Sequence, residues 1–394
     1  PYDALYLNPD TGTAEKCHYC AHRTELGLEP ACVSVCPEQA IVAGDADDPV
    51  SGIAGMIRDL PTRQRKPEKE TRPRIWYVDA LEEALVPGST TEPPQWLWAD
   101  RRSAPPTVNG FETPPDLVTT LNVDHPPVWG SHIPAYLLTK NLAAGAMIVA
   151  PFLTLLGTPG GLWPETAGLF FLAATLVLLV LDLERPERFL KLLLHPNPRS
   201  WLVKGTWVLT AFGGVTAASF VAGFFGRVET VRWLRFADLP LAVLASGYSA
   251  FLFRQCRGRD LWLEPGLFGQ LVLRAALLGT GLAILVTVLL PEPPPAASGL
   301  VFAVLALASL AGIAISQKSR GGSRDLRRAR ALFRCKKASR QGRGLLVVAA
   351  VLAASGAVTG AVPIFGGPAL LAAAAGLFLV EKAWIEAGQE VPLS

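Results

Sequence analysis

The sequence carries little charge for its length: only 18% of its 394 residues are Asp, Glu, Lys or Arg, whereas half are hydrophobic. In soluble globular proteins about a quarter of the residues are charged. The mean hydropathy is positive, at +0.33. This composition excludes an ordinary soluble enzyme and indicates a membrane protein.

Common catalytic motifs are also missing. The sequence has no G-x-x-x-x-G-K-[ST] phosphate loop, no H-E-x-x-H motif and no G-x-S-x-G serine elbow. We therefore expect no catalytic residues in this chain and assign substrate chemistry to a different subunit. Whether the chain counts as an enzyme itself stays open at this point.

Histidine is scarce, and only His132 of the five lies near a long apolar stretch. A haem held by histidine needs its axial ligands inside the helix bundle, so we expect no haem. An initiator Met and a signal-peptide pattern are both missing before Pro1. This start predicts that the chain is processed or is the later part of something longer.

Apolar stretches dominate the chain after Trp129. A membrane span needs about 20 mostly apolar residues, and eight stretches qualify: 133–156, 166–183, 202–225, 237–253, 267–290, 298–316, 344–362 and 367–385. The sequence therefore predicts a mainly α protein with an eight-helix transmembrane bundle over 129–394. Before it, residues 58–128 are rich in Pro and charge and predict an extended linker.

The basic residues are distributed unequally over the predicted connections. We call the side of the membrane that holds the N-terminal segment side N. Nineteen Lys and Arg fall on side N, against only Arg227, Arg232 and Arg235 opposite. The positive-inside rule predicts that side N is cytoplasmic, in an inner-membrane multi-pass protein. Topology explains this charge, so we expect no nucleic-acid partner.

Four of the six cysteines lie in KCHYCAHRTELGLEPACVSVCPEQA (16–40). Their spacing is Cys17-x2-Cys20-x11-Cys32-x3-Cys36-Pro37, which is compatible with a zinc site. A Cys-x3-Cys-Pro ending is typical of iron–sulfur proteins, in which the last cysteine serves the neighbouring cluster. The ending favours iron–sulfur, while zinc remains an alternative.

This stretch resembles the last cysteine group of the multi-cluster ferredoxin subunits that serve molybdopterin oxidoreductases, such as dimethyl sulfoxide, polysulfide and nitrite reductase systems. The resemblance implies a small α+β ferredoxin-like segment over 1–57. It implies that Cys17, Cys20 and Cys32 bind one [4Fe–4S] cluster, while Cys36 binds an adjacent one. An upstream segment or a partner chain would supply the remaining ligands.

Four blocks in the apolar part resemble, in order, the NrfD family of polysulfide-reductase-type membrane subunits. They are HPPVWGSHIPAYLLTKNLAAGA (125–146), DLERPERFLKLLLHPNPRSWLVKG (182–205), GYSAFLFRQCRGRDLW (247–262) and WIEAGQEVPLS (384–394). The resemblance implies an eight-helix membrane domain that exchanges electrons with a quinone, either menaquinone or ubiquinone.

His132, Tyr136 and Lys140 are spaced i, i+4, i+8 and predict one polar stripe along the first span, about 12 Å long. Charged groups inside a bilayer are functional by default, and a quinone needs hydrogen-bond partners and a supply of protons. We therefore interpret these residues as quinone-binding. The alternatives are a Lys–carboxylate pair that seals a helix contact and side chains that reach to the interface. By resemblance Tyr248 is a second quinone contact, or else an interhelical hydrogen bond.

Further charges lie in or beside the spans: Asp182 and Glu184 end the second, Arg274 is in the fifth and Glu381 in the eighth. They are candidates for proton transfer, and ion pairs that lock helix ends are the alternative.

The sequence thus predicts an electron-transfer and membrane-anchor subunit of a respiratory oxidoreductase. A molybdopterin enzyme is the first expectation for its catalytic partner and a nickel–iron hydrogenase the second; an upstream or separate iron–sulfur segment, quinone and membrane lipid are the other partners. The rival interpretation is a transporter or proton channel with a structural zinc domain.

Overall fold

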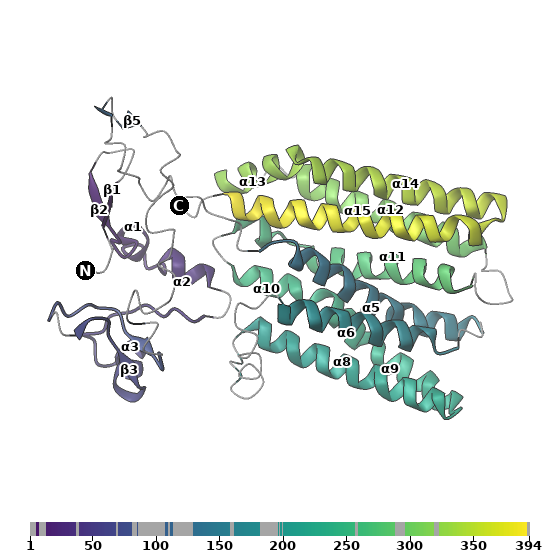
Figure 1. The fold of residues 1–394 in the computed structure, drawn as a ribbon, viewed down its shortest axis with the longest axis horizontal. Coiled ribbons are helices and arrows are strands. Elements are labelled where there is room, and N and C mark those ends of the chain that lie inside the picture. Colours follow the sequence, from purple (N-terminus) through teal and green to yellow (C-terminus); the bar gives the residue numbers. More distant parts are fainter. Residues whose placement is uncertain are drawn as a thin grey trace. The chain divides into compact units, whose positions relative to one another are not determined.

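The computed structural model describes residues 5–7, 13–36, 39–67, 70–80, 85, 107–108, 111–112, 129–157, 161–181, 196, 198, 200–256, 259–287, 296–318 and 323–391. The chain divides into two compact units, one formed by residues 1–33 and 40–126 and the other by 34–39 and 127–394. Figure 1 labels the elements of both.

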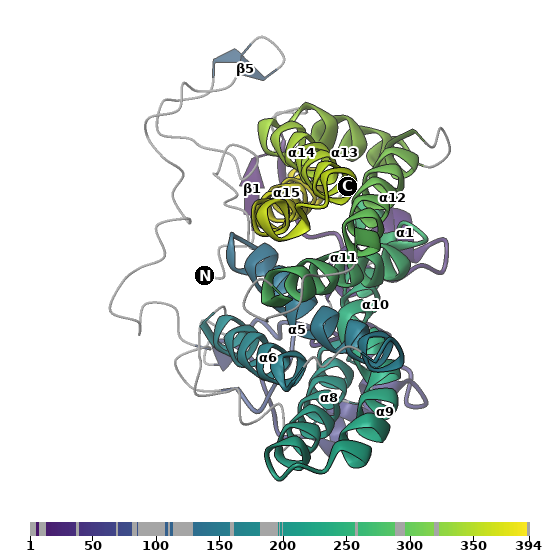
Figure 2. The ribbon, with the colours of Figure 1, turned by 90° about the vertical axis from the view of Figure 1, so that its right-hand side faces the viewer.

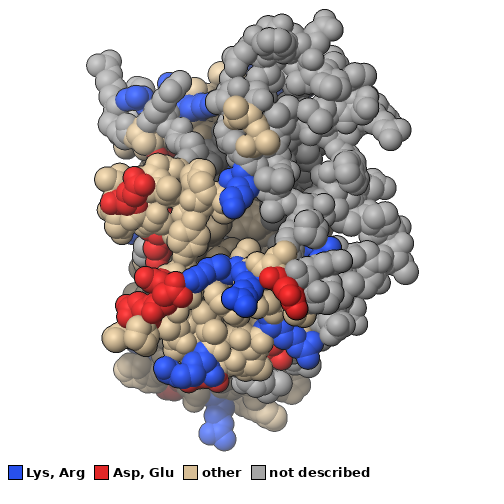
Figure 3. Space-filling model, turned by 90° about the vertical axis from the view of Figure 1, so that its left-hand side faces the viewer, with Lys and Arg blue, Asp and Glu red and all other residues tan. Residues whose placement is uncertain are grey.

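Short hairpins and helices build the N-terminal part. Strand β1 (Leu5–Leu7) pairs antiparallel with β2 (Ala14–Lys16) and leads into helix α1 (Ala21–Thr24) and helix α2 (Ala31–Val35). Helix α3 (Gly52–Asp59) begins after Ser51, whose hydroxyl caps it by accepting a hydrogen bond from the Ala54 N–H at 3.2 Å. On the face in Figure 3, basic and acidic side chains alternate among uncharged ones.

Two further hairpins follow in the segment predicted as a linker. Strand β3 (Thr62–Arg63) pairs with β4 (Tyr77–Val78), and β5 (Thr107–Val108) pairs with β6 (Phe111–Glu112), both antiparallel. Most of residues 81–128 lie outside the described residues. The linker therefore stays a prediction.

Eight helices among the described residues are long and apolar enough to cross a membrane, which confirms the predicted bundle. They are α5 (His132–Leu155), α6 (Trp163–Leu181), α8 (Trp201–Phe224), α9 (Val228–Gly247) with α10 (Ser249–Gln255), α11 (Leu267–Thr287), α12 (Ala296–Lys318), α14 (Lys337–Thr359) and α15 (Val362–Glu390). In Figure 2, α5 and α11 lie between a group with α12, α14 and α15 and a group with α6, α8 and α9.

Several helix boundaries differ from the predicted spans. The prediction counted apolar residues only, whereas the helices continue through charged residues at their ends. The fourth span begins at Val228 rather than at 237, and the seventh at Lys337 rather than at 344. Two connections also form helices of their own, η5 (Asp260–Leu263) and the amphipathic α13 (Arg324–Cys335). Arg330 fixes α13 to the connection after η5 through an ion pair with Glu264 at 2.6 Å.

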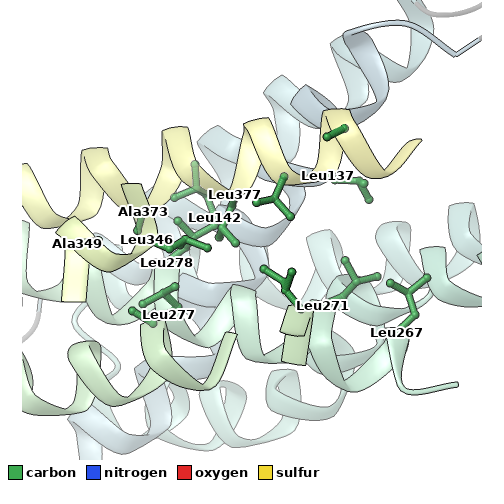
Figure 4. Packing of buried hydrophobic residues seen from close by; sticks show 14 of the residues in the cluster. Leu137, Leu142, Leu267, Leu271, Leu277, Leu278, Leu346, Ala349, Ala373 and Leu377 are labelled. Atoms are coloured by element: carbon green, nitrogen blue, oxygen red, sulfur yellow. The ribbon is translucent and has the colours of Figure 1, made fainter. Parts of the chain in front are cut away.

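Glycine contacts bring the central helices together. A Cβ on Gly145 of α5 would lie 2.1 Å from the Ala275 carbonyl oxygen of α11, and one on Gly279 would lie 2.0 Å from the Gly145 oxygen. Only glycine permits this approach, as small residues do in other membrane helix pairs. Leucines such as Leu137, Leu278 and Leu377 fill the neighbouring space (Figure 4).

Candidate functional site

The first two motif cysteines lie where strand β2 gives way to helix α1. Tyr19 and Cys20 have positive φ angles of 58° and 50°, a left-handed conformation that non-glycine residues rarely adopt. Backbone strain of this kind concentrates at binding and catalytic sites. The Tyr19 hydroxyl accepts a hydrogen bond from the Gly44 N–H at 2.9 Å, and the Arg23 Nε donates to the Glu29 carbonyl at 2.9 Å.

None of the four motif cysteines is in a disulfide; Cys17 and Cys32 are exposed, and Cys20 and Cys36 are half-buried. Accessible thiols fit a metal–sulfur centre, whose ligands are thiolates. In the part of the protein that the structure describes, however, no three His, Cys, Asp or Glu side chains come together as a metal site. The assignment of cysteines to particular clusters therefore stays a prediction.

Three of the four residues predicted to bind quinone meet in the membrane unit. Lys140 of α5 is 1% exposed, and its Nζ donates to the Ser246 carbonyl at 2.9 Å and to the Ser249 hydroxyl at 2.6 Å. The Tyr136 hydroxyl contacts the Ser249 hydroxyl and donates to the Tyr248 hydroxyl at 3.1 Å. We call Tyr136, Lys140, Tyr248 and Ser249 the Ser249 cluster.

The two tyrosine rings also stabilise the ammonium group. The Lys140 Nζ lies 4.6 Å from the centre of the Tyr248 ring and 5.3 Å from that of Tyr136, within the range of a cation–π interaction. His132, the fourth predicted residue, is exposed at the first position of α5, one turn before Tyr136.

The fold creates this cluster at the break between α9 and α10. Helix α9 ends at Gly247 and α10 begins at Ser249, so the Ser246 carbonyl can accept from Lys140. Tyr248, which lies between the two helices, keeps helical φ and ψ angles of −58° and −29°. A Cβ on Gly205 of α8 would lie 2.2 Å from the Tyr248 ring, so glycine makes room for that ring. Sequence reasoning gave Ser249 no role, although it lies within one of the family-like blocks.

Arg274 and Glu381, two of the predicted proton-transfer residues, also meet. The Arg274 Nη1 donates to the Glu381 Oε1 at 3.2 Å, and its Nη2 donates to the Gln270 Oε1 at 3.2 Å. The Glu381 Oε2 is buried without a hydrogen-bond partner among the described residues. Asp182 and Glu184 lie outside the described residues.

A pocket opens beside this ion pair, between α11, α12, α13 and α15. Gln270 and Arg274 supply polar walls, and Phe333, Val380 and Trp384 supply apolar ones. The Ser249 cluster itself is closed, because its polar groups are hydrogen-bonded to one another.

A second buried polar group, which we call the opposite-half cluster, lies toward the other end of the bundle. The Arg235 guanidinium binds both carboxylate oxygens of Glu165, at 2.7 and 3.0 Å. The Ser219 hydroxyl donates to Glu165 at 2.9 Å, and the Thr216 hydroxyl lies 2.7 Å from the Asp238 Oδ2. Sequence reasoning missed Glu165, which precedes the predicted second span, and treated Arg235 only as a loop charge.

Three of the four blocks named for their resemblance meet at the end of the bundle where α5 begins. Trp129 stacks on Trp262 with 4.8 Å between ring centres, and Trp262 is 6.3 Å from Trp384. The Trp129 N–H donates to the Gln389 side chain at 2.9 Å, and the Arg259 Nη1 donates to the Val391 carbonyl at 2.6 Å. These contacts place the motif residues around one end of the bundle, next to the Ser249 cluster.

Comparison with known families agrees with both parts of the chain. Residues 119–307 match the family described as polysulphide reductase, NrfD, and residues 1–46 match the 4Fe–4S dicluster domain. The chain therefore joins a 4Fe–4S dicluster segment to an NrfD-type domain, and with its eight helices it is a multi-pass membrane protein. The dicluster match supports 4Fe–4S clusters, rather than zinc, as the bound group.

Curated relatives are similar to a part of the chain. A tetrathionate reductase subunit of Salmonella typhimurium is 46% identical over 89 residues, 22% of this chain and 35% of that protein. The arsenate respiratory reductase iron-sulfur subunit ArrB of a Shewanella species is 48% identical over 66 residues, 17% of this chain and 28% of that protein. A polysulfide reductase protein of Wolinella succinogenes is 40% identical over 79 residues, 20% of this chain and 41% of that protein. The chain spans about a third of the length of these relatives.

Proposed function

We propose that this chain passes electrons between 4Fe–4S clusters and a membrane quinone, within a complex whose substrate chemistry takes place on a partner subunit. The joining of a dicluster segment to an NrfD-type domain supports this function, as do relatives named as parts of tetrathionate, arsenate and polysulfide reductases. The observation that carries it is the buried Ser249 cluster, because charged and phenolic groups inside a membrane are functional by default.

The hydrogen bonds of the Ser249 cluster run in one direction. Each hydroxyl has one proton to donate and can accept as well. Lys140 donates to Ser249, Tyr136 donates to Tyr248, and Ser249 is left to donate to Tyr136. The Tyr248 proton thus ends the series and is available to a quinone carbonyl.

Quinone reduction consumes two electrons and two protons, and quinol oxidation releases them. The clusters, when bound, supply or accept the electrons one at a time. In the reducing direction Tyr248 gives one proton to one carbonyl oxygen, and the hydrogen-bonded series from Lys140 replaces it. The other carbonyl oxygen takes the second proton from water. Lys140 then regains a proton that water in the pocket delivers through Glu381, and Arg274 pairs with the carboxylate that Glu381 becomes. His132 at the surface end of α5 completes the proposed quinone site, and Asp182 and Glu184 stay candidates for proton transfer.

The same proposal includes the cluster ligands, the membrane orientation, the catalytic partner and the type of quinone. Cys17, Cys20 and Cys32 bind one cluster and Cys36 an adjacent one. Side N faces the cytoplasm of an inner membrane, as the basic connections indicate. The catalytic partner is a molybdopterin enzyme in the first instance and a hydrogenase in the second. The quinone is menaquinone or ubiquinone, and we expect no haem.

Rapid mixing of the cluster-loaded holoprotein with a quinol tests the proposal. Quinol should bleach the visible absorption of the oxidised clusters, and Y136F and K140M should slow the bleaching about a hundredfold, the usual contribution of positioned proton donors. K204M is the matched control, because Lys204 lies on α8 over the Trp201 ring and outside the cluster. Equal rates in K140M and K204M would refute the proposed role of the Ser249 cluster.

A further inference from the structure

Asp238, in the opposite-half cluster, has no role in the function proposed above. Helix α5 starts at the Ser249-cluster end of the bundle, so α6 and α9 start at the other end. Glu165 lies in the first turn of α6, and Arg235 lies in the first half of α9. Asp238 is eight residues before Ser246 on α9, a distance of about 12 Å along the helix.

A layer of apolar side chains separates the two polar clusters. Between Asp238 and Ser246, α9 buries Ala242 and Ala245. These alanines belong to a buried apolar group that also contains Met147, Leu209 and Phe212. Because no polar group of α9 bridges this layer, protons that reach the Ser249 cluster do not pass directly to Asp238. The opposite-half cluster is therefore a separate site.

The charges of this cluster do not balance if both acids are ionised. Arg235 directs its hydrogen bonds to Glu165, to the Thr154 hydroxyl at 3.1 Å and to the Gly161 carbonyl at 2.7 Å. Asp238 is 0% exposed, and its Oδ1 has no partner among the described residues. The helices α8, α5 and α11 also pack against α9. Their cations within the bundle, Lys204, Lys140 and Arg274, lie in the half that holds the Ser249 cluster.

The hydrogen bonds of Thr216 indicate that a proton on Asp238 balances the charge of this cluster. Its hydroxyl is 2.9 Å from the Phe212 carbonyl oxygen and 2.7 Å from the Asp238 Oδ2. The hydroxyl has one proton, and a carbonyl oxygen accepts only. Both contacts are hydrogen bonds at once if Thr216 donates to Phe212 and a protonated Asp238 donates to Thr216. An ionised carboxylate with one hydrogen bond is also costly inside a bilayer.

We propose that Asp238 carries a proton and is a second proton-binding site, separate from the Ser249 cluster, that exchanges with the aqueous phase opposite to side N. That phase is the nearer one, because Asp238 lies one helical turn from Arg235 on α9, and Arg235 donates to the Gly161 carbonyl in an exposed turn between α5 and α6. The site takes a proton and nothing larger, since Asp238 is fully enclosed. The assignment does not depend on quinone chemistry.

Infrared spectroscopy of the purified protein in lipid nanodiscs tests this site without any electron transfer. A protonated carboxylic acid has a C=O stretching band that ionised carboxylates lack. We expect such a band at neutral pH, shifted after transfer to D2O because the proton exchanges. The spectrum of the unsubstituted protein minus that of D238N should contain this band. The same subtraction with E229Q, which removes an exposed carboxylate from the first turn of the same helix, should not contain it.

T216V provides a second measurement that keeps the carboxyl group. Loss of the hydroxyl removes the acceptor of the Asp238 proton, so the band should move to higher frequency. A spectrum without the band, or a band that survives D238N unchanged, would overturn the assignment. Quinol-driven bleaching of the clusters in the holoprotein should be the same in D238N as in E229Q, so failure here is distinguishable from failure of the proposed quinone function.

Discussion

The Ser249 cluster and the opposite-half cluster bury a cation in two different ways. Lys140 is held by a carbonyl, a hydroxyl and two aromatic rings, all of them neutral. Arg235 instead forms a two-point ion pair with Glu165. An ion pair of this geometry fixes both partners, whereas a lysine among neutral acceptors can give up its proton without leaving a buried opposite charge. Under the two proposals above, protons exchange at a cation at one end of the bundle and at an acid at the other.

The largest expected effect comes from breaking the ion pair. R235M leaves the Glu165 carboxylate buried without its cation, and such a loss destabilises a protein by about 3–5 kcal/mol. Chemical unfolding in detergent micelles measures this change. The double variant E165L/R235M should recover most of the stability, because replacing both partners by apolar residues removes the unpaired charge. A double variant as unstable as R235M would contradict the ion-pair interpretation.

K140M tests the other side of the comparison. Its partners are neutral, so we expect a loss of only about 1–3 kcal/mol from unmade hydrogen bonds, together with a reduction in quinol-driven cluster bleaching of about a hundredfold. Unfolding and rapid-mixing measurements on the same preparation separate the two effects. The comparison fails if K140M is as unstable as R235M and its rate is unchanged.

G205A perturbs the Ser249 cluster without removing any of its polar groups. The added methyl would meet the Tyr248 ring at 2.2 Å, and forcing atoms into a filled site usually costs about 1–3 kcal/mol. We expect slower quinol-driven bleaching because Tyr248 must move. G214A on the same helix is the control, since a Cβ there has no atom within 4 Å. Equal rates in the two variants would show that the position of Tyr248 is unimportant.

The smallest effect concerns an ion pair at the edge of the bundle. Burial disfavours the Lys336 charge, but hydrogen bonds to Glu390 and Glu386 outweigh it and raise the pKa of Lys336 above its ordinary value of 10.5. Because the folded pKa is the higher one, the stabilisation is complete below the ordinary value and is lost as the pH rises through the folded pKa.

K336M should therefore lower stability by less than about 1 kcal/mol at neutral pH, as for other partly exposed pairs. The difference from the unsubstituted protein should shrink at alkaline pH. Unfolding curves at several pH values measure it, with K337M, which alters an exposed neighbour, as the control. A difference that grows with pH would contradict the assigned sign.

The bundle could be predicted from the sequence because each span is encoded locally, as a run of apolar residues. The stripe of Tyr136 and Lys140 was predictable for the same reason, since helical spacing fixes which residues share a face. Ser249 and the Arg274–Glu381 pair were not predictable in their contacts, which depend on how each helix is rotated against its neighbours.

Glu165 shows a different limit. It lies in the first turn of α6, just before the apolar stretch from which the second span was predicted. Only its contact with Arg235 on α9 identifies it as a buried residue. The cysteine spacing predicted the class of bound group, which the dicluster match supports. It does not by itself fix the ligand geometry, because the remaining ligands are expected from outside this segment.

The glycine contact between α5 and α11 has a mechanical consequence. With backbone against backbone at Gly145 and Gly279, no side chain separates the two helices at their crossing, so we expect the helices to move together. Lys140 and Arg274 would then keep a nearly constant spacing. Tyr248 and Ser249 lie instead where α9 meets α10, on a different span. A quinone that binds at Tyr248 would therefore meet a site whose two cations are held on one pair of helices, so that their electrostatic field at the quinone stays constant.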